Sequence, residues 1–180
     1  MEKYLVLFRG INVGGKNKVP MADLKKCLES LGFANITTYI ASGNVILESD
    51  QDKNQTKFLI EQALPNCFHL DDEIVKVLVL SKNQVQTIIK RKPDGFGEQP
   101  DMYHSDVIFL IDVAVSQVLP IFNPREGVDK IWAGEFVVYS QRLSSQRTKS
   151  RLNKIMSSPF YKSMTIRNWN TITKLADLFS

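Results

Sequence analysis

The chain has 180 residues, of which 43% are hydrophobic and 23% are charged, and its formal net charge is +4. These proportions are typical of a globular protein and exclude collagen-like, extensively disordered and disulfide-rich classes. No window is apolar enough to cross a bilayer and residues 1–8 lack a signal-peptide cleavage site, so we expect a cytoplasmic protein with no membrane partner.

The first eighty residues predict a βαββαβ order. Apolar or alternating runs indicate strands, Ser42-Gly43 indicates a two-residue turn, and apolar residues at helical spacing indicate two helices, the second ending at Pro65. The predicted elements are strands at 3–9, 36–40, 44–47 and 74–80 and helices at 21–31 and 52–64. Cys27 and Cys67 fall in separate elements without metal-ligand spacing, and we expect buried thiols.

The remainder repeats this order of elements. A helix at 82–90 and a Gly- and Pro-containing connector at 91–104 precede it. The predicted elements are strands at 107–111, 130–132, 136–139 and 164–167 and helices at 113–122, 151–156 and 171–179. The fold class is therefore α+β, with two ferredoxin-like βαββαβ units in tandem and an extra C-terminal helix. We expect a first unit at 1–80, a helix and connector at 81–104, and a second unit with the last helix at 105–180.

Several motifs of the chain resemble those of a known bacterial family. The run LFRGINVGGKNKVPM at 7–21 is followed by LGF at 31–33, TYIASGNV at 38–45 and RNWNTITKL at 167–175. Together these are similar to domain-of-unknown-function family 1697 over essentially the whole chain. The resemblance implies a two-unit α+β fold and a cytoplasmic protein, and it implies no activity.

The Gly-rich loop after the first strand is the main candidate site. Its GINVGGK run has the spacing of a nucleotide-hydrolysis loop, but Asn17 stands where Ser or Thr would bind magnesium, so we reject that function. In a βαββαβ unit this loop shares one end of the sheet with the hairpin and with residues 67–72. Glycine amides and basic side chains there predict an anion-binding nest, against the alternative of a purely structural turn. The candidate ligand-binding residues are Arg9, Gly10, Asn12, Gly14, Gly15, Lys16, Lys18, Ser42, Gly43 and Asn44.

Charge is unevenly distributed along the chain. Residues 136–176 contain eight basic and no acidic residues, so the rest carries 15 basic and 19 acidic ones. Such a run is either a solvated face or a site for nucleic acid or an acidic partner. The second basic site comprises Arg142, Arg147, Lys149, Arg151, Arg167 and Asn168. RNA-recognition motifs share this element order, but their aromatic platform is mostly missing, and Trp132 and Trp169 favour core positions.

Three hypotheses about function follow from these features. The first is binding of a small anionic or phosphate-bearing ligand at the Gly-rich loop and the adjacent hairpin. The second is binding of nucleic acid or an acidic partner by the basic segment, and the third is a structural homodimer. His69 with Asp71 and Asp72 is interpreted as a polar turn, so no metal site is predicted. No catalytic group or cofactor is indicated, since Ser42 lacks a nucleophile setting and the cysteines have no histidine near them in sequence.

Overall fold

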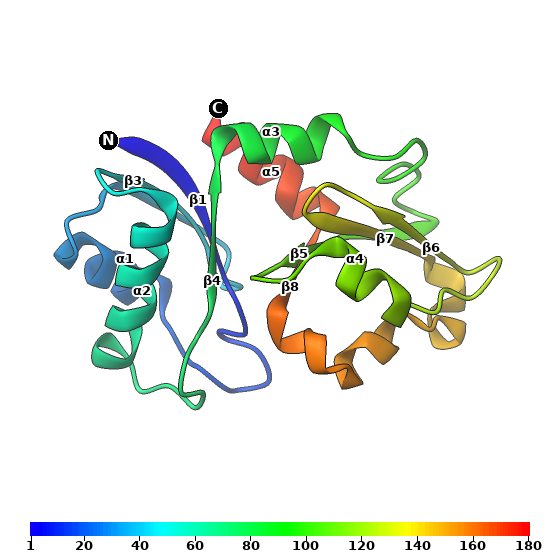
Figure 1. Ribbon diagram of the computed structural model, residues 1–180, viewed down its shortest axis with the longest axis horizontal. Helices are drawn as coiled ribbons and strands as arrows, with labels where there is room; N and C mark the ends of the chain where they lie inside the picture. Colours follow the sequence, from blue (N-terminus) through cyan, green and yellow to red (C-terminus); the bar gives the residue numbers. More distant parts are fainter. The chain divides into compact units, whose positions relative to one another are not determined.

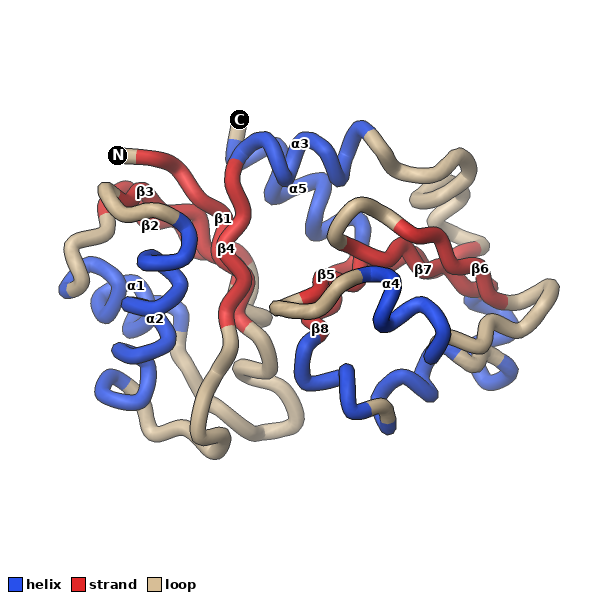
Figure 2. The backbone as a smooth tube through the Cα atoms, in the orientation of Figure 1, coloured by secondary structure: helices blue, strands red, loops and turns tan.

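The computed structural model describes residues 1–180, which form two compact units (Figures 1 and 2). Residues 1–86 and 179–180 make up the first unit and residues 87–178 the second. The boundary lies inside a helix, α3 (Lys82–Lys90), whose range agrees with the sequence prediction. None of the helices combines the length and the hydrophobicity that a bilayer span requires.

The first unit is a four-stranded antiparallel sheet covered by two helices. Its strands are β1 (Glu2–Phe8), β2 (Ala34–Tyr39), β3 (Asn44–Ser49) and β4 (Val77–Ser81), in the order β2-β3-β1-β4. The helices are α1 (Met21–Ser30) and α2 (Lys53–Cys67), which contact each other on one face of the sheet (Figure 1). Val6, Leu24, Val45 and Ile60 from these layers are fully buried, so the core forms between sheet and helices.

Two local predictions in the first unit are wrong. Helix α2 continues past Pro65 to Cys67, because a proline near the last turn removes one backbone donor without stopping the amide of Phe68 from reaching Leu64 at 2.9 Å. The connection between β2 and β3 has four residues, since Tyr39 pairs with Asn44, rather than the two of a Ser42-Gly43 turn.

The two cysteines do not remain free thiols. Cys27 on α1 and Cys67 at the end of α2 form a disulfide, with their Cα atoms 6.3 Å apart. Periodicity places each residue on its helix, but the pairing depends on how the helices pack. The expectation of two buried thiols is therefore wrong.

The second unit repeats the strand order of the first. Its strands are β5 (Tyr103–Leu110), β6 (Asp129–Ala133), β7 (Val137–Leu143) and β8 (Met164–Asn168), in the order β6-β7-β5-β8. Ile108, Val138 and Leu152 contribute to a core on one face of this sheet. The last helix, α5 (Trp169–Phe179), starts two residues before the predicted position.

The helices between these strands are shorter than predicted. Helix α4 (Val115–Val118) continues as one 3₁₀ turn, Leu119–Ile121, where a single helix was expected at 113–122. In place of the α-helix expected at 151–156, three 3₁₀ helices follow one another at Ser144–Lys149, Leu152–Ser157 and Pro159–Ser163. This stretch is rich in serine, whose side chains compete for backbone hydrogen bonds; the hydroxyl of Ser158, for example, accepts from the amide of Phe160 at 3.1 Å.

Candidate ligand-binding sites

Three segments that are distant in sequence meet at one end of the first sheet. The amide of Arg9 donates to the carbonyl of Lys76 at 3.0 Å, and the Nδ2 of Asn12 donates to the carbonyl of Ala41 at 2.8 Å. The loop after β1 therefore lies against the β2–β3 turn and the segment before β4. Figure 2 shows the long loops after β1 and before β4 together at this end of the unit. The sequence predicted this meeting of segments.

Asn12 holds the two sides of the loop together. Besides its bond to Ala41, its Nδ2 donates to the carbonyl of Val19 at 2.8 Å, and its Oδ1 accepts from the amide of Val19 at 2.8 Å. Both amide hydrogens of the Asn12 side chain are thus engaged within the protein. Asn12 positions the loop instead of presenting a donor to a ligand.

Asn17, whose residue type alone indicated only a departure from a nucleotide loop, anchors the loop to the segment before β4. It is 1% exposed. Its backbone amide donates to Asp71 Oδ2 at 2.6 Å, and its Nδ2 donates to Asp72 Oδ2 at 2.6 Å and to the carbonyl of Gly10 at 3.0 Å. Its Oδ1 accepts from the amides of Asp71 and Asp72 at 2.9 and 3.1 Å. The polar turn at 71–72 therefore clamps the loop.

The tip of the loop is a tight turn with exposed donors. Val13 and Lys16 form an isolated antiparallel bridge, and the amide of Lys16 donates to Val13 at 3.1 Å. Gly14 and Gly15 between them have φ of +59° and +76°, the left-handed pair of a type I′ turn. Their amides donate to no group of the protein, and the side chains of Lys16 and Lys18 are exposed. The glycines thus make the turn and leave two N–H groups without a protein acceptor, close in sequence to two exposed lysines.

The β2–β3 turn packs closely against the end of β1 and the start of the Gly-rich loop. Gly43 has a φ of +86°, and a Cβ there would lie 2.7 Å from both Ile11 Cδ1 and Phe8 Cβ. Asn44 is fully buried, and its Nδ2 donates to the carbonyl of Tyr39 and to Ser42 Oγ, each at 3.0 Å. Gly43 is required for close packing, and Asn44 and Ser42 stabilise the turn.

The structure divides the second basic site between the two faces of a sheet. Arg142 pairs with His104 across β7 and β5, whereas Arg167 pairs with Val107 across β8 and β5. Since side chains alternate along a strand, Arg142 and Arg167 project from opposite faces. Arg167 is 6% exposed and donates to Thr165 Oγ1 at 2.8 Å, and its burial lowers its pKa to about 10. Arg167 belongs to the interior of the fold, which its sequence context did not reveal.

The other members of this site lie at the surface or at a helix end. Arg147 and Lys149 are exposed and form no ion pair with any carboxylate. Arg151 is half-buried, and its backbone amide donates to Asp129 Oδ2 at 2.9 Å. Asn168 accepts the amide of Asn170 at 2.9 Å at the start of α5. No ion pair therefore neutralises the positive charge of Arg147 and Lys149 in the 3₁₀ helix Ser144–Lys149.

An aromatic cluster occupies the face of the second sheet opposite Arg142. Phe96 makes edge-to-face contacts with Trp132, Tyr139 and Trp169 at centroid distances of 5.9, 5.1 and 5.2 Å. Tyr139 donates to the carbonyl of Ile88 at 2.8 Å, and burial raises its pKa to about 12. The core position predicted for Trp169 is confirmed, and these rings do not form an exposed platform for bases.

A cavity in the second unit brings together residues that no sequence pattern connects. It has a volume of about 80 Å³, with His104, Asp106, Arg142 and Asn153 among its polar lining residues. His104 Nε2 lies 3.0 Å from Asp106 Oδ2. Burial raises the pKa of Asp106, and the charges of His104 and Arg142 partly oppose that rise. His104 lay in the predicted connector, and only the longer β5 aligns it with Asp106 and Arg142.

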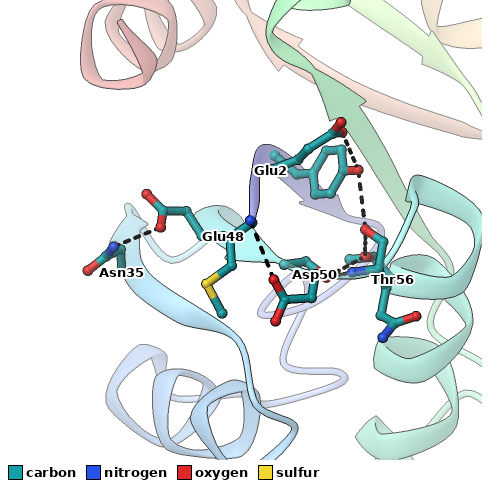
Figure 3. Close-up of polar contacts among 9 residues, drawn as sticks. Glu2, Asn35, Glu48, Asp50 and Thr56 are labelled. Carbon is teal, nitrogen blue, oxygen red and sulfur yellow. Dashed lines mark hydrogen bonds and ion pairs between the residues drawn. The ribbon is translucent and has the colours of Figure 1, made fainter.

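A second polar pocket lies at the end of the first sheet opposite the loop, and its lining includes Glu2, Asp50 and Asp52. Figure 3 shows Glu2, Glu48 and Asp50 with their partners. Tyr4 donates to Glu2 at 2.7 Å, Asn35 donates to Glu48 at 2.8 Å, and the N-terminal ammonium lies 3.4 Å from Asp50. Burial, followed by the contact with Glu2, raises the pKa of Tyr4 to about 12. Glu2 and Asp50 are thus held by contacts within the first unit.

Comparisons with known proteins agree with this architecture. A family model described as "Protein of unknown function (DUF1697)" matches residues 1–139. The solved structure of the conserved bacterial protein SP0830 from Streptococcus pneumoniae is 28% identical in sequence, with a TM-score of 0.86 and coverage of 99% of each chain. Comparison with curated proteins gave no match. Since the family model covers more than half of its length, the chain belongs to the DUF1697 family of proteins of unknown function.

Proposed function

We propose that this protein binds a small anionic ligand, such as a phosphate-bearing one, at the Gly14–Gly15 turn of the first unit. The observation that carries the proposal is the pair of unpaired glycine amides between the Val13–Lys16 bridge residues, next to the exposed Lys16 and Lys18. Backbone amides and ammonium groups both donate hydrogen bonds to phosphate oxygens, and charged acceptors strengthen such bonds.

The rigidity of the loop supports the same function. Asn12 and Asn17 fix both sides of the loop through side-chain hydrogen bonds of 2.6–3.0 Å. A loop that is already ordered loses little conformational entropy when a ligand binds, which favours affinity. In this proposal Asn12, Ser42, Gly43 and Asn44 position the loop, while Gly14, Gly15, Lys16 and Lys18 contact the anion.

Net charge does not supply the attraction at this loop. Arg9, Lys16 and Lys18 are balanced by Asp71, Asp72 and Glu73 in the adjoining segment. Recognition must therefore come from short-range contacts to the glycine amides and the two lysines. A ligand held in this way depends on shape and hydrogen bonding more than on long-range steering.

Thermal unfolding in the presence of an anion panel tests the proposal. Inorganic phosphate, phosphorylated metabolites and matched unphosphorylated compounds are compared for the wild type and for the Lys16→Gln/Lys18→Gln double variant. We expect at least one phosphate compound to raise the unfolding temperature of the wild type but not of the double variant. Lys25→Gln on the exposed surface of α1 is the control. Equal stabilisation of the wild type and the double variant would exclude this site.

A second candidate function, binding of nucleic acid or an acidic partner, rests on the basic segment of the second unit. Arg147, Lys149, Lys154 and Lys162 are exposed and form no ion pair. The aromatic rings are packed around Phe96, so this function would rely on phosphate contacts and lose affinity steeply with salt. Filter binding of RNA and DNA between about 50 and 200 mM salt checks it.

We also propose that both units are ferredoxin-like and that the protein forms a homodimer. The strand order β2-β3-β1-β4, repeated as β6-β7-β5-β8, supports the description of both units as ferredoxin-like. The homodimer remains a prediction, which light scattering at several concentrations checks.

A further inference from the structure

Arg142 is a half-buried cation whose Nε lacks a hydrogen-bond partner. Its Nε has no hydrogen-bond partner and is shielded from solvent, and its Nη1 reaches only Asn153 Oδ1, at 3.4 Å. A guanidinium carries five N–H donors, and leaving a buried donor without an acceptor is unfavourable. An acceptor that fills the neighbouring space would therefore be bound favourably.

The two acidic neighbours of Arg142 form no ion pair with it. Asp106 interacts with His104 at 3.0 Å, and no ion pair joins Asp106 to Arg142. The residue opposite Arg142 on β6 is Asp129, whose Oδ2 accepts the amides of Arg125 and Arg151, both at 2.9 Å. Asp129 Oδ1 is buried without a hydrogen-bond partner, and no ion pair joins it to Arg142.

The cavity beside Arg142 has one polar end and apolar walls. His104, Asp106, Arg142 and Asn153 lie among its polar lining residues, whereas Ile108, Leu152, Ile155, Met156 and Ile166 provide apolar surface. Its volume of about 80 Å³ is several times the ~10–15 Å³ that one water needs. The space therefore fits a group of a few non-hydrogen atoms and is too small for a nucleotide.

From these features we infer a second binding site, independent of the Gly-rich loop, for a small monocarboxylate with a short apolar chain. A planar carboxylate matches the paired N–H groups of a guanidinium, and Arg142, which lines the cavity, makes one weak side-chain hydrogen bond, at 3.4 Å to Asn153 Oδ1. The apolar chain of the ligand lies against Leu152 and Ile155. Exposed Lys154 and Lys162 adjoin the lining residues Asn153 and Tyr161 in sequence and attract anions toward this part of the unit.

Amide NMR titrations of the full-length protein test the site. The probes are acetate, propionate and butyrate, with propionamide and butyramide as neutral controls of similar shape. We expect saturable shifts in the amides of residues 152–156 with the acids, affinity rising from acetate to butyrate, and at least tenfold weaker binding of the amides. Shifts of equal size with acids and amides, or no saturable shift, would overturn the inference.

Two substitutions separate a specific site from general attraction of anions. Arg142→Gln should weaken butyrate binding roughly tenfold or more, because it removes a charged donor pair. Arg147→Gln, an exposed change outside the cavity, should leave it unchanged. If Arg142→Gln does not fold, Leu152→Phe tests the same cavity by filling it and should exclude butyrate while sparing phosphate binding at the loop. Unchanged butyrate affinity in the folded cavity variant would overturn the site.

The source of the carboxylate is distinguished by one further probe. N-acetylvaline presents a carboxylate as the end of a protein chain does, whereas butyrate represents a free acid. Tighter binding of butyrate supports a free short-chain acid, as we propose. Tighter binding of N-acetylvaline would overturn that part of the proposal and assign the site to chain ends.

Discussion

Asn17 Nδ2 donates a 2.6 Å hydrogen bond to Asp72 Oδ2, joining two residues that are 55 positions apart in the sequence. Together with the bonds of Asn17 to Asp71, this contact fixes the Gly-rich loop against the segment before β4. The geometry of the proposed anion site depends on this clamp, because no helix or strand holds the loop between β1 and α1.

Removing the clamp should destabilise the protein and loosen the loop. Asn17→Ala leaves the amides of Asp71 and Asp72 without their acceptor, which we expect to reduce the free energy of unfolding by about 2–3 kcal/mol. Urea denaturation measures this change, with the exposed Asn54→Ala on α2 as control. A loss of less than about 0.5 kcal/mol, the range of ordinary surface substitutions, would show that the clamp is unimportant.

Two glycines of the site should respond differently to alanine. Gly43→Ala forces a Cβ to within 2.7 Å of Ile11 Cδ1 and Phe8 Cβ in addition to the strain of a positive φ, and we expect a loss of about 3 kcal/mol. Gly14→Ala meets no atom within 4 Å, so only the strain, about 1 kcal/mol, remains. Thermal and urea denaturation of both variants check the order, and equal losses would contradict the packing at Gly43.

The disulfide should contribute measurably to stability. Cys27 and Cys67 are separated by 40 residues, and closing a loop of that size restricts the unfolded chain by about 2–4 kcal/mol. We expect a reducing agent to lower the unfolding temperature of the wild type but not of Cys27→Ala/Cys67→Ala. Mass spectrometry after alkylation without reduction checks the bond directly. Modification of both cysteines in the folded, unreduced protein would contradict the pairing.

Asp106 should make stability depend on pH. Burial raises its pKa above the ordinary value of 3.8, so the folded state binds the proton more tightly than the unfolded state. This contribution is fully present below 3.8 and is lost as pH rises through the higher folded pKa. The stability of the wild type relative to Asp106→Asn should therefore fall as pH rises from 3.8 and then level off. The exposed Asp94→Asn controls for general charge effects. A rise with pH in the stability of the wild type relative to Asp106→Asn would contradict the raised pKa.

Local patterns predicted much of the architecture but not the pairings that depend on packing. Apolar alternation located all eight strands to within a few residues, and the βαββαβ order predicted that the loop, hairpin and 67–72 segment meet. Periodicity could not pair Cys27 with Cys67, because that depends on the orientation of α1 against α2. It also missed the 3₁₀ helices after β7, where serine side chains compete for backbone hydrogen bonds.

The candidate sites show the same limit. Glycine and lysine content indicated the loop, but only the structure shows that Asn12 and Asn44 use their side-chain donors internally. The grouping of His104 with Asp106 and Arg142 required the register of β5 against β7, which residue types do not determine. Arg167 looked like part of a basic surface until its strand face was known.

The amide resonances of Gly14 and Gly15 test the central claim most directly. In a titration of the wild type with inorganic phosphate or a phosphorylated ligand, we predict saturable shifts of both amide protons to lower field, because each gains a charged acceptor. The Lys16→Gln/Lys18→Gln variant should show much weaker shifts at the same concentrations. Saturable binding of the anion with the Gly14 and Gly15 resonances unmoved would contradict the assignment of the site to this turn.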